Sequence, residues 1–196
     1  MKKLLPMALT ALLWCTWPLY SESEEPDAGM VAIDGYLIDV YEYPNIAGAA
    51  PKVDITWAQA QSLCQARGKR LCSESEWEEA CRGPDNFAYG YGPEFDQNRC
   101  NTAYRVGEVW RRDRGTTSSG AFAECTNGYG VYDMIGNVWE WTDGRFNQEQ
   151  KDWHVVRGGS WFHSVNLARA SSRYGHHLDE EYSLDLVGFR CCRSAE

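Results

Sequence analysis

The eight cysteines constrain the fold of this 196-residue chain more than any other feature of its sequence. Cys15 lies in a short basic and then apolar N-terminal segment, which is typical of a secretory signal peptide over residues 1–21. Export would place the other seven in an oxidising compartment, where disulfides persist. These candidates for structural disulfides are Cys64, Cys72, Cys81, Cys100, Cys125, Cys191 and Cys192. Because seven is odd and the spacings match no zinc motif, we expect disulfides with at least one cysteine left free or paired outside the chain.

The N-terminal segment is compatible with two localisations. Cleavage after residues 1–21 would release a secreted or periplasmic protein whose residues 22–29 form an acidic linker. Lipid attachment at Cys15 would instead give an outer-envelope lipoprotein, although Trp14 is not the small residue that lipid-modifying pathways prefer. No other apolar run reaches the length of a transmembrane helix. A net charge of −9 without a cluster of Lys and Arg excludes a binder of duplex nucleic acid.

Local signals predict one domain over residues 30–193, with its regular structure concentrated near the start. Asp34-Gly35 between two apolar runs predicts a β-hairpin. Capping boxes that begin at Thr56 and Ser73 predict two short helices, which place Cys64 and Cys81 on their apolar faces. The rest is rich in Gly, Asn, Tyr and Trp, and we expect only short strands there, over 106–110, 130–134, 138–142, 153–157 and 187–191.

Four motifs follow one another in an order typical of a known family. They are Gly-Lys-Arg-Leu-Cys at 68–72 with Ser-Glu-Trp-Glu-Glu-Ala at 75–80, Gly-Asn-Val-Trp-Glu-Trp at 136–141, Arg-Gly-Gly-Ser-Trp at 157–161 and Val-Gly-Phe-Arg-Cys at 187–191. As a set, over residues 30–192, they resemble the formylglycine-generating enzyme (sulfatase-modifying factor) superfamily. The resemblance implies a C-type-lectin-like α+β fold, with two short helices on a small antiparallel sheet, loop-rich and stapled by disulfides.

The family's enzymes oxidise a sulfatase cysteine with copper(I) held by two cysteines soon after the Gly-Gly-Ser motif. Counting along this chain places His163 and Ala168 at those two positions. A single His cannot replace the two soft thiolates that copper(I) requires. Adjacent Cys191 and Cys192 cannot easily direct both sulfurs at one ion and are better explained by disulfides. We therefore expect neither copper nor formylglycine-generating activity.

Calcium is the metal that the resemblance supports. The family's ion is held by side-chain and backbone oxygens, and the matching residues are Asp133, Gly136, Val138 and Glu140. The alternative is that the two carboxylates only accept backbone N–H bonds in the same turn. A second family site maps onto Asn101, Thr102 and Asp113, but Arg111, Arg112 and Arg114 flank it. His176-His177 could hold a transition metal or belong to a solvated loop.

Three functions are compatible with this pattern. We prefer a non-catalytic exported domain that binds a ligand or an envelope partner through residues 162–186, the segment that variable proteins of this fold use for binding. Tyr, Arg and His suit recognition there, and the candidate residues are His163, Asn166, Arg169, Arg173, Tyr174 and His176. One alternative is a metal-dependent oxidase or maturation factor with an altered site that modifies a secreted peptide or protein. The other is a structural envelope lipoprotein.

Overall fold

The computed structural model describes residues 28–147, 149, 153–177 and 185–195, so the segment 1–21 and most of the linker 22–29 lie outside it. Within the described residues the chain forms two helices and ten short strands. In order they are β1 (Met30–Ile33), β2 (Tyr36–Asp39), α1 (Trp57–Gln65), β3 (Arg70–Leu71), α2 (Glu74–Arg82), β4 (Tyr104–Val106), β5 (Val109–Arg111), β6 (Trp139–Arg145), β7 (Trp153–Arg157), β8 (Arg173–His177), β9 (Val187–Phe189) and β10 (Cys191–Ser194). None of these helices is long and apolar enough to cross a membrane.

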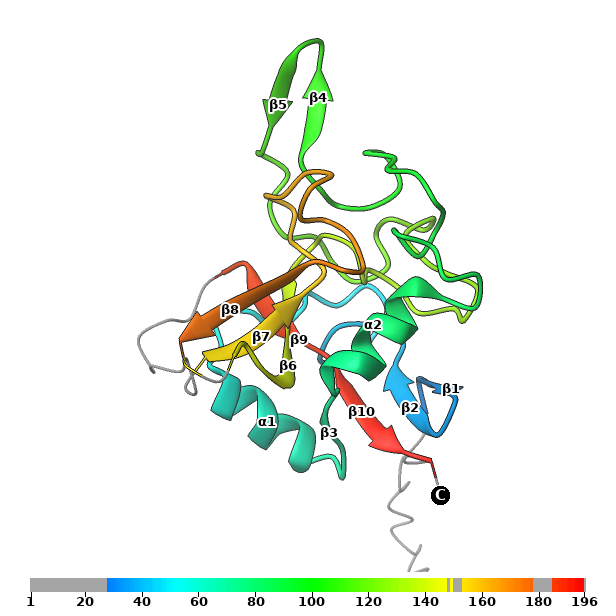
Figure 1. The fold of residues 1–196 in the computed structure, drawn as a ribbon, viewed down its shortest axis with the longest axis vertical. Coiled ribbons are helices and arrows are strands. Elements are labelled where there is room, and N and C mark those ends of the chain that lie inside the picture. The colour runs from blue at the N-terminus through cyan, green and yellow to red at the C-terminus, as the bar shows by residue number, and fades with distance from the viewer. Residues whose placement is uncertain (1–27, 148, 150–152, 178–184, 196) are drawn as a thin grey trace, which may run out of the picture.

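The strands form two four-stranded sheets and one separate hairpin. The first sheet has the order β1-β2-β10-β3, the second β8-β7-β6-β9, and β4 pairs only with β5. Pairing is antiparallel except between β6 and β9, which run parallel. The mixed α+β class is thereby confirmed, with two small sheets where the sequence predicted one. Figure 1 shows the β4–β5 hairpin projecting from the end of the molecule opposite the C-terminus.

Both helices begin at the residues that the sequence indicated. The Thr56 and Ser73 side chains each accept a hydrogen bond from the backbone N–H three residues later, and the Gln59 and Glu76 side chains each accept one from the backbone N–H of the cap residue, so both capping boxes are complete. The second helix ends at Gly83, whose φ of 70° is a conformation that glycine adopts without strain. These local hydrogen bonds fix where each helix starts, and its apolar side then packs into the core.

Strand β10 joins the two apolar clusters of the core. Side chains alternate across a strand, so Cys191 and Cys192 point to opposite faces. Cys191 forms a disulfide with Cys64 of α1 in one cluster, and Cys192 forms one with Cys72 in the other. The third disulfide joins Cys100 to Cys125 in the loop region.

The predicted disulfide candidates are therefore confirmed with one exception. Cys81 on α2 is the odd cysteine, a buried free thiol whose Sγ lies 3.6 Å from the carbonyl oxygen of Met134. Spacing alone could not show which of the seven this would be.

Some strand predictions were wrong for identifiable reasons. Residues 130–134 form no strand beyond one isolated bridge between Thr126 and Tyr132, because Asp133 adopts a φ of 56° that breaks the extended backbone. The stretch 106–110 contains the turn of a hairpin, since Gly107 and Glu108 separate β4 from β5. The stretch 187–191 is divided at Arg190, between β9 and β10. The stretch 138–142 lies in β6 except for its first residue, and 153–157 coincides with β7.

Candidate functional site

The turn after β7 requires two consecutive glycines. Gly158 and Gly159 have φ values of 90° and 79°. A Cβ on Gly158 would lie 2.7 Å from the carbonyl oxygen of Met134, and one on Gly159 would lie 2.8 Å from that of Leu167. Backbone strain and lack of space therefore both exclude a side chain here. This packing fixes Ser160, the next residue, against the loop that follows it.

Ser160 holds the ring of His163. The Ser160 Oγ lies 2.8 Å from His163 Nδ1, and the Ser160 backbone N–H donates to the same ring nitrogen at 3.2 Å. A backbone N–H can only donate, so Nδ1 is the acceptor and the ring proton resides on Nε2. Burial, together with the nearby charge of Arg112, lowers the pKa of His163 below its ordinary value, which keeps the ring neutral at neutral pH.

The two positions where the resemblance implies copper thiolates offer no soft ligand. The His163 Nδ1 is already hydrogen-bonded, and Ala168 is fully buried in the core with no ligand atom in its side chain. The free thiol of Cys81 lies on α2, where burial raises its pKa above the ordinary value. Such a thiol stays protonated and is a poor metal ligand.

Aromatic rings meet at the surface above these positions. Five residues form a chain of ring contacts with centroid distances from 5.1 to 6.3 Å, and we call them the aromatic surface: Trp139, Trp161, Phe162, His163 and Tyr174. Phe162 is 43% exposed and Tyr174 is 52% exposed, whereas Trp139 is buried beneath them. The rings of Phe162 and Tyr174 are therefore open to solvent and are connected through His163 and the buried Trp139.

The structure brings only some of the predicted binding residues together. His163 and Tyr174 belong to the aromatic surface, and Asn166 and Arg169 are exposed on the same loop. Arg173 is instead occupied by contacts within the molecule, because its guanidinium binds Glu74 and the carbonyl oxygens at positions 145 and 146. For His176 the structure describes the backbone in β8 but not the side chain.

Sequence reasoning included Phe162 in the predicted segment 162–186 without singling it out, and it missed Trp161 and Arg112. Phe162 and Trp161 follow Ser160 directly, and Arg112 reaches them from the distant hairpin segment. The run of three aromatic residues at 161–163 was a signal that could have indicated the first two. Arg112 could not have been found, because 50 residues separate it from Phe162.

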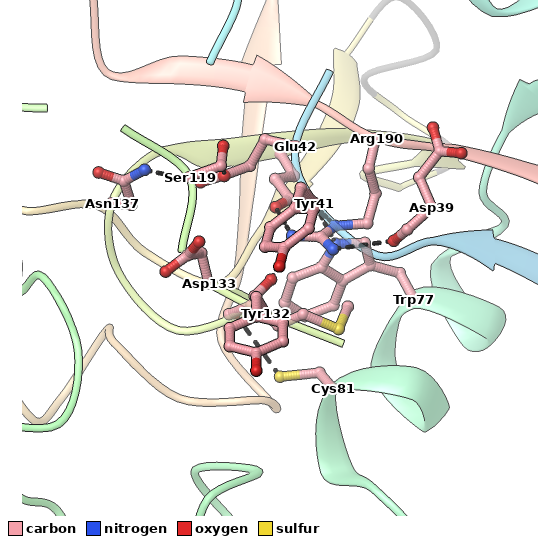
Figure 2. A network of polar contacts seen from close by, with 12 residues as sticks. Asp39, Tyr41, Glu42, Trp77, Cys81, Ser119, Tyr132, Asp133, Asn137 and Arg190 are labelled. Carbon is pink, nitrogen blue, oxygen red and sulfur yellow. Dashed lines mark hydrogen bonds and ion pairs between the residues drawn. The ribbon is translucent and has the colours of Figure 1, made fainter. Parts of the chain in front are cut away.

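A buried ion pair lies on the other side of Trp139. Arg190 donates to both carboxylate oxygens of Glu140 at 2.7 Å, and Trp77 Nε1 donates to one of them at 2.6 Å. The remaining Arg190 N–H groups reach the carbonyl oxygens of Asp39, Val40 and Tyr132. Figure 2 shows the Arg190 side chain between Asp39 and Glu42, above the Trp77 ring. Both charges of this pair are therefore compensated and hydrogen-bonded.

A second pair of carboxylates lies in the same cluster and lacks such compensation. Glu42 accepts hydrogen bonds from Ser119 Oγ at 2.5 Å and Asn137 Nδ2 at 2.8 Å, and Asp133 accepts one from the Gly120 N–H at 2.6 Å (Figure 2). Burial and the neighbouring charge of Asp133 raise the pKa of Glu42 to about 8, and burial raises that of Asp133 to about 6. Neither forms an ion pair with a described residue.

The predicted calcium ligands Asp133 and Glu140 have different surroundings in the structure. Asp133 is buried, anionic and next to a tight turn at Gly136, where a Cβ would lie 2.2 Å from the carbonyl oxygen of Asn101. Glu140 has both oxygens bonded to Arg190 and Trp77. No three His, Cys, Asp or Glu side chains converge as metal ligands in the described part of the chain. The Asp133 carboxylate therefore has no cation among the described residues, whereas Glu140 is already paired with Arg190.

The second mapped calcium site is occupied by protein cations. Arg114 Nη1 donates to the carbonyl oxygen of Thr102 at 3.2 Å, and Arg111 binds the carboxylate of Asp113 at 2.8 Å. The buried Oδ1 of Asn101 has no hydrogen-bond partner. The guanidinium groups supply the positive charge here, so Asp113 and Thr102 do not form a free set of calcium ligands.

Comparisons with known proteins identify the family to which the chain is similar. Residues 40–195 match the family described as sulfatase-modifying factor enzyme 1-like domain. The chain is 36% identical over 157 residues to bovine (Bos taurus) inactive C-alpha-formylglycine-generating enzyme 2, covering 74% of this chain and 50% of that protein. It is 35% identical over 141 residues to the formylglycine-generating enzyme of Thermomonospora curvata, covering 67% and 43%. The chain thus spans about half the length of these relatives or less.

Solved structures share the fold at low sequence identity. Treponema denticola variable protein 1 superposes with a TM-score of 0.64 at 17% identity, covering 82% of this chain and 84% of that one. PvdO from Pseudomonas aeruginosa superposes with a TM-score of 0.63 at 19% identity, covering 82% and 80%. These likenesses concern the fold alone.

Proposed function

Because the chain belongs to the family of sulfatase-modifying factor enzyme 1-like domains, we propose that it is an exported, non-catalytic member of the family that binds a ligand or an envelope partner. The observation that carries the proposal is the pair of positions after Gly-Gly-Ser. One holds His163, whose Nδ1 is bonded to Ser160, and the other holds the buried Ala168. Neither supplies the thiolate that copper(I) requires. The relatives named inactive formylglycine-generating enzyme 2 support the same conclusion.

Export is part of the proposal because of the disulfides. Six of the eight cysteines are cross-linked within the described residues. Such bonds are stable in secreted and periplasmic proteins and are rare where thiols are kept reduced. Binding is the other part. The aromatic surface lies on loops supported by the sheets, which is where binding residues commonly reside.

A copper(I) titration tests the absence of catalysis. The purified protein should bind no stoichiometric copper(I) and should convert no cysteine in a peptide that carries a sulfatase motif. The matched variant replaces His163→Cys and Ala168→Cys together, which restores two thiols on the same scaffold. We expect this variant to bind copper(I), because the thiolates are the missing ligands. Stoichiometric copper or iron with oxygen consumption in the unchanged protein would favour an altered metal-dependent oxidase instead.

We also propose that the turn at Asp133 binds calcium. The observation that favours it is a pair of buried carboxylates, Asp133 and Glu42, which form no ion pair with a described residue and whose pKa values are raised above all by burial. Calcium would supply positive charge to hard oxygen ligands, namely the Asp133 carboxylate and the carbonyl oxygens of Gly136 and Val138. Glu140 would contribute through an oxygen that it shares with Arg190.

Thermal unfolding with and without calcium tests this second proposal. Calcium should raise the Tm of the unchanged protein relative to EDTA, because a ligand that binds only the folded state stabilises it. Asp133→Asn should abolish the shift. Asp85→Asn, which removes an exposed carboxylate, is the matched control and should retain it. An equal Tm with calcium and with EDTA in the unchanged protein would refute calcium binding.

A further inference from the structure

The β4–β5 hairpin exposes an apolar tip that the fold itself does not use. Val106 and Val109 lie directly opposite each other on either side of the turn, and each is 61% exposed. No other strand of the described residues pairs with this hairpin, which projects from one end of the molecule (Figure 1). Transfer of two exposed apolar side chains from water into a contact with another molecule is favourable. The tip therefore has the composition of a contact surface.

Arg112 attaches the hairpin to the aromatic surface. Its Nε donates to the carbonyl oxygen of Phe162 at 3.0 Å, and its guanidinium lies 5.2 Å from the centre of the Phe162 ring. Arg114 anchors the base of the hairpin through the carbonyl oxygens of Cys100 and Thr102 and stacks 4.3 Å from the Tyr104 ring. The loop of residues 161–169 and the base of the hairpin lie at the same end of the molecule (Figure 1). Through Arg112 the hairpin and the aromatic surface are thus connected, and we treat them together as one face.

This face carries positive charge on an acidic protein. Residues 104–114 contain four arginines against Glu108 and Asp113, whereas the whole chain has a net charge of −9. Arg105 and Arg111 are paired with those two carboxylates. Arg112 and the exposed Arg169 form no ion pair within the described residues. Two guanidinium groups beside exposed apolar side chains are thus available to carboxylates of another molecule.

We propose that the hairpin tip and the aromatic surface together dock an acidic segment of a partner protein, a segment that also carries apolar side chains. This inference rests on the proposed binding function and specifies its partner. Apolar side chains of the segment would pack on Val106, Val109 and Phe162, while its carboxylates would pair with Arg112 and Arg169. Such a combination of apolar contact and opposite charge gives both affinity and orientation.

The turn of the hairpin disfavours a lipid as the occupant. Glu108 belongs to the turn between the two valines, and its side chain is 98% exposed. Inserting the tip into a bilayer would carry this carboxylate into an apolar phase, which is costly for an ion. A protein partner can instead leave Glu108 in water at the edge of the contact. The free positive charge of Arg112 and Arg169 is also too small to hold a nucleic acid by its phosphates.

Selection from a random peptide library on the immobilised full chain tests the proposal. The enriched peptides should combine Asp or Glu with apolar residues, and the affinity of a synthesised representative should fall as salt rises, because its charged contacts are screened. Arg112→Gln should weaken binding of that peptide roughly tenfold, and Val106→Ser with Val109→Ser by a similar factor. Fluorescence anisotropy measures each affinity.

Two matched controls exist elsewhere on the chain. Arg67 also lies over a ring, 4.3 Å from that of Tyr43, and donates to the carbonyl oxygen of Pro44 at 2.9 Å. Arg67→Gln should therefore leave the affinity unchanged. Ile46 is 56% exposed, and Ile46→Ser should also have no effect. Circular dichroism and Tm establish that every variant is folded.

Other outcomes would overturn the proposal in distinguishable ways. Loss of binding with Phe162→Ala, but not with the hairpin variants, would refute the hairpin while leaving binding at the aromatic surface intact. Enrichment of basic or purely apolar peptides, or no enrichment, would refute an acidic partner. Hairpin-dependent binding to vesicles of anionic phospholipid would favour a membrane, and hairpin-dependent dimerisation in sedimentation would favour a second copy. The copper(I) titration tests the absence of catalysis independently of all these results.

Discussion

The two ends of this molecule are held together by different means. At the end that contains β1, β2, β3 and β10, two disulfides join β10 to α1 and to the segment before α2. At the end that contains β4, β5 and the loop of 160–172, one disulfide and a set of arginine contacts hold long irregular segments. The first end provides a rigid base, and the second presents side chains to solvent. A loop surface can change its residues freely only when the stability of the fold comes from elsewhere.

Removing disulfides from either end gives the largest expected effect. The Cys64–Cys191 bridge spans 127 residues and the Cys100–Cys125 bridge spans 25. Because the Cys72–Cys192 bridge closes nearly the same loop, both bridges of the base have to be removed together. Loop-closure entropy then predicts a loss in the free energy of unfolding of about 5 kcal/mol or more for Cys64→Ala, Cys72→Ala, Cys191→Ala and Cys192→Ala together, and about 3.5 kcal/mol for Cys100→Ala with Cys125→Ala. Urea unfolding of the quadruple and the double variant measures the difference. A larger loss of stability on removing the Cys100–Cys125 bridge would show that the loop end, and not the end with β10, provides the rigid base.

Arginine substitutions compare the two ends without touching a disulfide. Arg190→Met leaves Glu140 buried and unpaired, which should cost about 4 kcal/mol. Arg114→Met removes three hydrogen bonds to carbonyl oxygens at a partly exposed site and should cost about 1–2 kcal/mol. Both replacements retain a long apolar chain, so each acts as the other's control. Equal losses in thermal unfolding would show that the two ends depend on charge to the same degree.

The pH dependence of stability tests the contact of Glu42 with Ser119 and Asn137, where the two ends of the molecule meet. Glu42 follows β2 at the base, and its partners Ser119 and Asn137 belong to the loops. Its folded-state pKa of about 8 lies above the ordinary value of 4.5, so the folded state binds the proton more tightly. The resulting stabilisation is complete below about pH 4.5 and is lost as pH rises through 8.

We expect the unchanged protein to lose on the order of 2 kcal/mol of unfolding free energy between pH 5 and 8 through Glu42. The Glu42→Gln variant should not show this part of the loss, because the amide cannot ionise. Asp133, with a pKa raised to about 6, should account for part of the slope that remains. Urea unfolding over a pH series measures both proteins. A wild-type stability that increases from pH 5 to pH 8 would contradict the raised pKa values.

The hairpin tip should give the smallest effect on stability. Val106→Ser with Val109→Ser changes side chains that contact mainly water, so the free energy of unfolding should change by less than about 0.5 kcal/mol. The Tm of the double variant measures this. A marked decrease would mean that the hairpin supports the fold, and it would weaken the distinction between a structural base and a binding face.

Local hydrogen bonding made much of the fold predictable from the sequence. Thr56 and Ser73 marked both helix starts, and Asp34-Gly35 marked the first hairpin, because each signal acts within four residues. The failures involved residues that respond to distant partners. Asp133 adopts a positive φ at a turn that directs its carboxylate to Gly120, and Arg190 interrupts a strand to reach Glu140.

The candidate site was less predictable than the fold. His163 and Tyr174 could be placed at the surface from the segment that they occupy, but Arg173 has the same character in sequence and binds Glu74 instead. Its role depends on α2, 99 residues away along the chain. The pairing of the cysteines could not be predicted from the sequence either, because it depends on the face of β10 on which each cysteine lies.

The adjacent cysteines of β10 also impose an order on biosynthesis. Cys64 and Cys72 cannot form their native bonds until more than a hundred further residues have been made, since their partners are Cys191 and Cys192. Cys100 and Cys125 can pair much earlier. A chain interrupted before residue 191 can form the loop bridge but neither bridge of the base, and Cys64 and Cys72 would then lack their partners. Closure of the base is in this way chemically linked to completion of the chain.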